Sequence, residues 1–128
     1  MAVSSAQLAM GGAGMTLALA RRHPYDVPLL HGRAEHMRRD SVLLGTAMSA
    51  PVVMLAAQLG ATVQLARGES RPATGLLRGL GAVMVAGYLA ERHVRHRLRP
   101  SGWDGVETPL LVAGLALSTA MAAPSLTA

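Results

Sequence analysis

Four long apolar stretches alternate along the chain with three connectors that hold most of its charged residues. The stretches cover residues 3–20, 41–66, 75–91 and 108–125. A helix of a water-soluble protein carries charge along one face, whereas residues 1–20 and 108–128 contain no charged side chain. About 20 apolar residues in an α-helix cross the roughly 30 Å hydrocarbon core of a bilayer. The pattern therefore predicts an all-α integral membrane bundle of four transmembrane helices, forming a single domain over residues 1–128.

The four stretches differ in the strength of this signal. Residues 41–66 are uncharged and contain Pro51, which predicts a kink because a proline inside a helix removes one backbone hydrogen bond. Residues 3–20 predict a retained helix instead of a signal peptide, since the arginines follow the stretch and do not precede it. Residues 75–91 contain Arg78 and are the weakest span; if they lay in the interface, three spans would remain and the C-terminus would face inward.

The distribution of arginine predicts the orientation. All twelve basic residues are arginine, and nine of them lie in the first and third connectors. These two connectors share one side of a four-span protein, and the positive-inside rule makes that side cytoplasmic. We therefore expect a multi-pass protein of the cell inner membrane with both termini outside. The net charge of +5 is explained by contact with anionic lipid headgroups, and with an aromatic content of 2% no base-stacking surface indicates nucleic acid.

Small residues are frequent in every stretch and predict close helix packing. Gly75 and Gly79 form a GxxxG pattern, and Gly45 and Ser49 have the same spacing. Such residues let helices approach each other in lipid, so we expect a tight bundle that forms a homo-oligomer or joins a larger membrane complex. The halves also share short similarities, for example residues 45–51 with residues 118–124. A parallel tandem duplication of a two-helix hairpin would explain them, and chance matches in Ala-rich sequence are the alternative.

The two arginine-rich connectors also contain most of the side chains that can bind a metal or transfer a proton. All five histidines lie there, together with Tyr25, Asp26, Asp40, Glu91, Trp103, Asp104 and Glu107. Residues 31–40 predict a short helix on which His31 and Glu35 share a face, as do His36 and Asp40. Imidazole and carboxylate are common metal ligands. The metal-ligand candidates are His31, Glu35, His36, His93 and His96. Ordinary i, i+4 ion pairs such as Glu35 with Arg39 are the alternative interpretation.

Three classes of function remain open at this point, and no motif identifies a cofactor. The leading hypothesis is a non-catalytic accessory, scaffold or lipid-interacting subunit. A second is a membrane enzyme that acts on a lipophilic substrate at the cytoplasmic interface through the histidine and carboxylate residues. A third is a small oligomeric transporter or channel, with Arg78, Gln58 and Gln64 as its polar lining. The chain has no cysteine, which excludes disulfides and thiolate chemistry.

Overall fold

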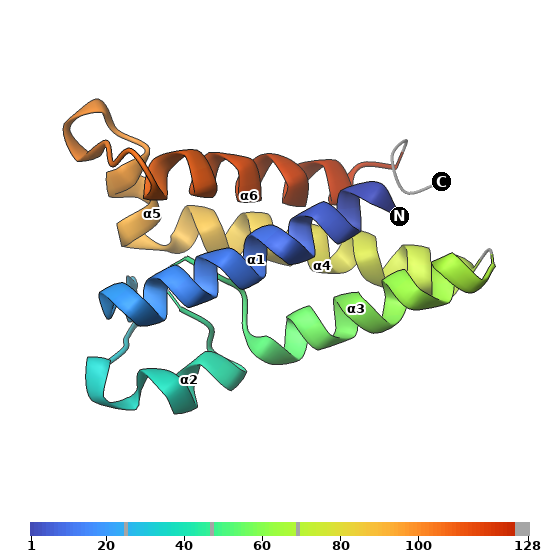
Figure 1. Cartoon of the computed structure of the whole chain (residues 1–128), viewed down its shortest axis with the longest axis horizontal. Helices are drawn as coiled ribbons and strands as arrows, with labels where there is room; N and C mark the ends of the chain where they lie inside the picture. Colours follow the sequence, from blue (N-terminus) through green and yellow to red (C-terminus); the bar gives the residue numbers. More distant parts are fainter. Residues whose placement is uncertain (25, 47, 69, 125–128) are drawn as a thin grey trace.

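The computed structural model describes residues 1–24, 26–46, 48–68 and 70–124. Tyr25, and Ala47 and Ser125 of the expected spans, lie outside the described residues. Within the described residues the protein is mainly helical, which confirms the all-α prediction (Figure 1). Its α-helices are α1 (Ala2–Arg21), α2 (Met37–Leu43), α3 (Val52–Arg67), α4 (Arg71–Ala90), α5 (Arg92–Arg97) and α6 (Glu107–Ala122). The 3₁₀ turns η1 (Ala34–His36) and η2 (Pro100–Gly102) and the short hairpin β1 (Asp26–Val27) and β2 (Leu30–His31) complete the fold.

The four long helices form a ring in which each contacts two neighbours. Helix α1 packs on α3 and α6, and α4 packs on the same two helices. The start of α1, the end of α6, the end of α3 and the start of α4 lie together at one end of the bundle, which we call the terminal end (Figure 1). The opposite end carries α2, α5 and the loops around them, and we call it the connector end. All the arginine-rich connector segments are therefore gathered at one end of the molecule.

Small and polar side chains are buried in the ring, while several large apolar side chains lie on its outside. Helix α1 buries Ser4, Gln7, Gly11, Gly14 and Ala18, a stripe of small and polar residues at helical spacing. Large apolar side chains on the long helices face outward instead; Val83 is 58% exposed and Leu59 is 51% exposed. Small residues bring the helix backbones close together, and they leave the bulk of the apolar surface on the outside of the ring.

Polar side chains inside the ring hydrogen-bond from helix to helix, although the side-chain oxygens of Gln7 and Gln58 have no partner among the described residues. The Ser4 hydroxyl lies 2.6 Å from the Thr62 hydroxyl, and the Gln58 amide donates to the Ser4 carbonyl at 2.8 Å. The Gln7 amide donates to the Ser118 hydroxyl at 3.2 Å, which joins α1 to α6. Gln58 thus faces the neighbouring helices, whereas Gln64 is exposed. A buried polar group without a partner is costly, so these bonds specify how the helices are rotated.

The second apolar stretch is not one kinked helix, which corrects the expectation for residues 41–66. Helix α2 ends at Leu43, and α3 begins only at Val52, directly after Pro51. Between them the backbone turns at Gly45, whose φ is +82°, and Thr46 and Ser49 exchange backbone hydrogen bonds of 3.0 and 3.3 Å. Proline has no N–H and favours an extended residue before it, so Pro51 starts a helix here instead of bending one.

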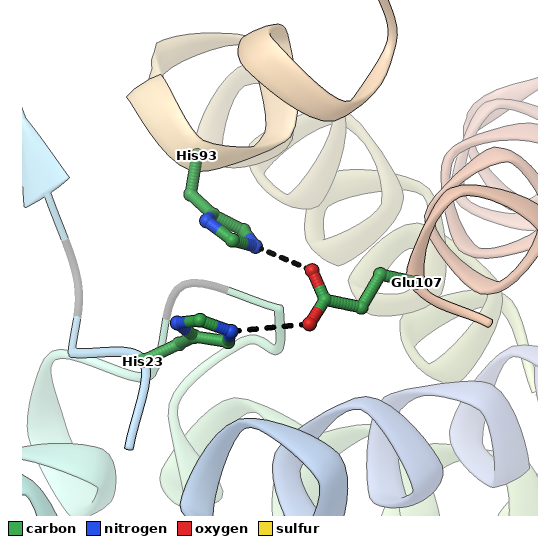
Figure 2. Close-up of side chains that lie close together, drawn as sticks. All are labelled: His23, His93 and Glu107. Carbon is green, nitrogen blue, oxygen red and sulfur yellow. Dashed lines mark hydrogen bonds and ion pairs between the residues drawn. The ribbon is translucent and has the colours of Figure 1, made fainter. Parts of the chain in front are cut away.

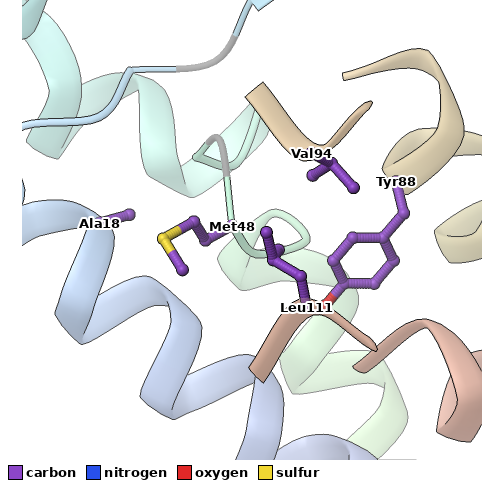
Figure 3. Packing of buried hydrophobic residues seen from close by; sticks show 5 residues of the cluster. All are labelled: Ala18, Met48, Tyr88, Val94 and Leu111. Atoms are coloured by element: carbon purple, nitrogen blue, oxygen red, sulfur yellow. The ribbon is translucent and has the colours of Figure 1, made fainter. Parts of the chain in front are cut away.

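This non-helical segment, residues 44–51, turns into the bundle and completes its core near the connector end. Met48 is fully buried against Ala18, Tyr88, Val94 and Leu111, which come from α1, α4, α5 and α6 (Figure 3). The segment fits because Gly14 has no side chain; a Cβ at this position would collide with the Met48 carbonyl oxygen. A second cluster of Ala61, Ala73, Leu77, Met84 and Met121 fills the ring toward the terminal end.

Only α4 among the described residues is long and apolar enough by itself to cross a bilayer. Helices α3 and α6 are apolar and have 16 residues each. The two halves of the chain share similar sequences at residues 45–51 and 118–124, but these two segments differ in structure. Gly45 lies in the non-helical segment, whereas Ser118 lies within α6. A duplication therefore stays a prediction from the sequence.

Gly81 is the closest approach of α4 to α6 and yields a stability prediction. A Cβ at Gly81 would lie 2.7 Å from the Ala122 nitrogen and 2.8 Å from the Ser118 oxygen, both in the α6 backbone. Gly81→Ala should therefore destabilise the protein by about 1–3 kcal/mol through overpacking. Gly12→Ala on the exposed face of α1 meets no atom within 4 Å and should stabilise by about 0.5–1 kcal/mol. Thermal unfolding followed by circular dichroism compares the two, and equal shifts would contradict the α4–α6 packing.

Candidate functional site

The connector end contains one fully buried carboxylate, that of Glu107. Glu107 is the first residue of α6, where the helix dipole and the free backbone N–H groups favour a negative charge. Helix α5 begins immediately after α4, because Glu91 leaves helical geometry and caps the His93 amide. His93 and Arg97 are four residues apart on α5, so they share one face, and this face is turned toward Glu107.

Four N–H groups converge on the two oxygens of Glu107. Oε1 accepts from Arg21 Nη1 at 2.6 Å and lies 3.1 Å from His23 Nε2. Oε2 accepts from Arg97 Nε at 2.7 Å and lies 2.8 Å from His93 Nε2. The His23 and His93 rings lie next to each other on the same side of the carboxylate, each facing a different oxygen, with ring centroids 4.4 Å apart (Figure 2). These contacts, which we call the Glu107 network, connect the end of α1, α5 and the start of α6.

Local backbone geometry directs the α1 residues into this network. Arg22 ends α1 in the left-handed conformation, with φ 55° and ψ 46°, and the His23 amide then donates to the Ala18 carbonyl at 2.9 Å. This reversal turns His23 back toward α6 beside Arg21. Asp104 supports the other side, because its Oδ1 accepts from the Glu107 amide at 2.8 Å and its Oδ2 lies 3.3 Å from Arg21 Nη1.

The network shifts the pKa values of its acidic groups and of His93. Burial alone would raise the pKa of Glu107, but hydrogen bonds from Arg21, His93 and Arg97 outweigh it and lower that pKa to about 2. Backbone hydrogen bonds from Glu107 and Val106 likewise lower the pKa of Asp104 to about 2. Burial lowers the pKa of His93, and its hydrogen bond to Glu107 only partly opposes this. The network therefore favours an ionised Glu107 beside a neutral His93 imidazole.

Glu91 forms a second contact between the connectors. Its Oε1 and Oε2 each accept from the Asp26 amide at 2.9 Å, which fixes β1 against the start of α5. Glu91 is 5% exposed, and burial raises the pKa of its carboxyl, although backbone hydrogen bonds from Asp26 and His93 counteract part of that effect. Glu91 and Glu107 are thus two buried carboxylates whose surroundings shift their pKa values in opposite directions.

His23, His93 and Glu107 are close enough together to be considered as a metal centre. One ligand atom from each lies within 4.8 Å of the others. However, both oxygens of Glu107 already accept from a guanidinium, of Arg21 and of Arg97 respectively. A carboxylate has about four lone-pair positions, and here four N–H groups face them. A cation at this place would displace hydrogen bonds and stand beside two positive charges. The geometry favours an ion-pair network over a metal site.

The candidate ligands from the sequence do not gather at one point. His93 contacts Glu107, but His96 is exposed on the same helix. His31 lies in β2, so the expected helical face shared with Glu35 does not form; Pro28 lies in the turn of this short hairpin, and Gly32 follows it. His31 Nε2 lies 3.5 Å from Asp26 Oδ1 and 3.4 Å from Arg92 Nη1. Glu35 and His36 are exposed in η1. Metal binding by these five residues stays a prediction.

Sequence reasoning placed Glu107 among the connector residues without identifying it as the centre of the network. A usable signal was present, because Glu107 is the acidic residue directly before an uncharged apolar stretch. The i, i+4 spacing of His93 and Arg97 was a second signal. The contribution of His23 depends on the reversed turn at Arg22, which the sequence pattern does not reveal.

In comparisons with known proteins, no protein-family model, curated protein or solved structure matches this chain.

Removing the charge of Glu107 should destabilise the fold strongly. Glu107→Gln replaces an anion by a neutral amide and leaves the guanidinium groups of Arg21 and Arg97 without their shared counter-ion. Loss of one partner from a buried ion pair costs about 3 kcal/mol or more. Glu35→Gln, at an exposed position, should stay within about 0.5 kcal/mol of the unaltered protein. Thermal unfolding compares the two, and equal stabilities would show that the network contributes little.

The shifted pKa values also predict how stability depends on pH. The pKa of Glu107 is lowered from 4.5 to about 2, so its stabilising contribution is complete above pH 4.5 and is lost as the pH falls toward 2. The lowered pKa of His93 acts in the same direction below pH 6.5, and the raised pKa of Glu91 opposes it. We expect unfolding midpoints to drop between pH 4.5 and 2, with a shallower drop in Glu107→Gln. An unchanged slope in that variant would contradict the assignment.

Proposed function

We propose that the chain is a four-span membrane protein that acts as a non-catalytic, lipid-interacting module. Its spans are α1, the broken second span of α2 and α3, α4, and the part of α6 after Glu107. The connector end lies at the cytoplasmic face of the cell inner membrane, and both termini lie outside.

One observation carries this proposal: polar side chains lie inside the ring while large apolar side chains lie on its outside. Ser4, Gln7 and Gln58 are at most 3% exposed, whereas the outer faces of α3, α4 and α6 carry exposed large apolar side chains such as Leu59, Val83 and Val112. In water this arrangement would expose apolar surface over the length of the bundle, and in lipid it is the favourable one. The broken span supports the proposal too, since non-helical backbone at membrane depth is tolerated where protein buries it, as with Met48.

The non-catalytic part of the proposal follows from the Glu107 network. A general base needs a free lone pair aimed at the substrate, and a metal ligand needs one aimed at the metal. Both oxygens of Glu107 are instead occupied by donors of the protein itself. The network is best explained as a lock that fixes the connector end. The Arg78 guanidinium donates to the Pro124 carbonyl at 2.8 Å at the terminal end, so it does not favour a transport pathway.

The outer face of α4 offers a contact surface for a second copy of the chain or for a larger membrane partner. Gly75 and Gly79 are exposed, and a Cβ at either position meets no atom within 4 Å. The GxxxG pattern therefore does not pack inside the ring. It is available for the homo-oligomer or larger complex that small residues favour in lipid.

The absence of cysteine makes the topology directly testable. Single cysteines replace Arg67, the last residue of α3 at the terminal end, and Ser101, in the third connector. In intact cells a membrane-impermeant maleimide should label Arg67→Cys, and it should label Ser101→Cys only after the membrane is opened. Both variants should stay with the membrane during carbonate extraction.

Two outcomes would overturn the proposal. Release of the protein by carbonate would show that the long helices do not span the bilayer. Labelling of both cysteines from the same side would contradict the four-span topology. Metal bound stoichiometrically by the purified protein, and lost on His23→Asn or His93→Asn, would instead favour the enzyme hypothesis.

A further inference from the structure

A cavity of about 290 Å³ lies beside the broken second span. The non-helical segment forms one wall with Leu44, Thr46, Ser49, Ala50 and Pro51. The opposite wall belongs to α4, and Met54 of α3 and Val27 of β1 complete the lining; the α4 residues are Val83, Met84, Gly87 and Tyr88. The volume is about twice that of an engineered apolar cavity that holds benzene, roughly 150 Å³. The cavity exists because α2 and α3 are separated and residues 44–51 turn inward.

The cavity opens through the side of the bundle. Two of its lining residues, Leu44 and Val83, are 47% and 58% exposed. Both belong to the outer apolar surface that faces lipid under the proposed function. A molecule dissolved in the bilayer could therefore enter without crossing the headgroup layer.

The lining carries one acidic group and no basic one among the residues that form it. Glu91 is 5% exposed and contributes to the wall near the connector end. Its Oε1 accepts from the Asp26 and His93 amides and its Oε2 from the Asp26 amide, so part of the roughly four lone-pair positions of the carboxylate remains for a ligand. An anionic head would meet a buried carboxyl group without a counter-ion. Burial, which raises the pKa of Glu91, also disfavours the charged form that would attract a cation, whereas a hydroxyl can hydrogen-bond to the carboxyl group. The side chains of Thr46 and Ser49 add two hydroxyl groups to the wall.

We propose that this cavity, called the lateral pocket, binds an uncharged lipophile with a hydroxyl head, such as a long-chain alcohol. The hydroxyl lies at Glu91, the first part of the chain occupies the apolar wall, and the rest extends between Leu44 and Val83 into the bilayer. This inference rests on the proposed membrane insertion and names the ligand class of the same lipid-interacting module.

Gly87 provides a variant that fills the pocket without disturbing the packing. A Cβ at Gly87 meets no atom within 4 Å, and leucine is a better helix former than glycine. Gly87→Leu should therefore fold while its side chain occupies the lateral pocket. Gly60→Leu on α3 is the matched control, because its Cβ position is equally open and Gly60 does not line the pocket. Val83→Trp fills the mouth from an exposed position and serves as a second variant.

The experiment measures photolabelling by a diazirine derivative of hexadecanol in phosphatidylcholine nanodiscs. Labelling of the unaltered protein should be saturable and should map to α4 or residues 44–54. Gly87→Leu and Val83→Trp should each reduce it about tenfold or more, and Gly60→Leu should leave it unchanged. Unlabelled hexadecanol should compete about tenfold more strongly than palmitate or a hexadecyl ammonium cation.

Each failure has a distinct meaning. Non-saturable labelling, or equal labelling of Gly87→Leu and Gly60→Leu, would overturn the lateral pocket while the cysteine topology result still supported the membrane module. Equal competition by palmitate or by the cation would overturn the assigned ligand class. A protein released by carbonate would overturn the proposed function, and the pocket inference with it.

Discussion

The connector end depends on the neutralisation of one buried negative charge. A carboxylate removed from water is stable only if its oxygens are hydrogen-bonded and its charge is balanced. Glu107 meets both requirements through donors from α1, the turn after it and α5. Because the donors come from segments distant in sequence, the charge holds together the end of α1, the helix α5 and the start of α6. The position of α5, which contributes His93 and Arg97, therefore depends on the neutralisation of the Glu107 charge.

Helix α5 also links the Glu107 network to the lateral pocket. It begins directly after Glu91, whose side chain caps the helix. The same carboxylate accepts a hydrogen bond from the Asp26 amide and lines the pocket. His93, only two residues later, contacts Glu107. A shift of α5 would therefore change both the ion pairs and the pocket wall. The two carboxylates have opposite surroundings, since Glu107 faces guanidinium groups and Glu91 faces an apolar wall and backbone amides.

The interior of the ring explains why a non-helical segment can occur in the second span. Small residues such as Gly14 let the Met48 backbone approach α1 closely, and the Met48 side chain fills the space between four helices. The segment satisfies part of its own backbone through the Thr46–Ser49 pairing. Helix packing by small residues, the break at Pro51 and the pocket are therefore consequences of one arrangement.

The helical class and the approximate positions of α1 and α6 follow from the sequence alone. Long uncharged apolar stretches such as residues 3–20 and 108–125 favour helices, and these coincide with α1 and α6 within a few residues. The sequence also determined which connectors hold the polar groups, because charge was confined to them. These features depend on local composition and on periodicity along the chain.

The tertiary structure alone decided which of those polar groups meet. Of the five candidate ligands only His93 contacts Glu107, whereas His31 lies in a hairpin and His36 and His96 are exposed. The contacts of Glu107 join residues up to 86 positions apart, through a turn at Arg22 that no pattern indicates. The break between α2 and α3 likewise depends on the close packing of the Met48 carbonyl group against Gly14 of α1. Such contacts are set by packing across the bundle, and the order of residues along the chain carries no direct record of them.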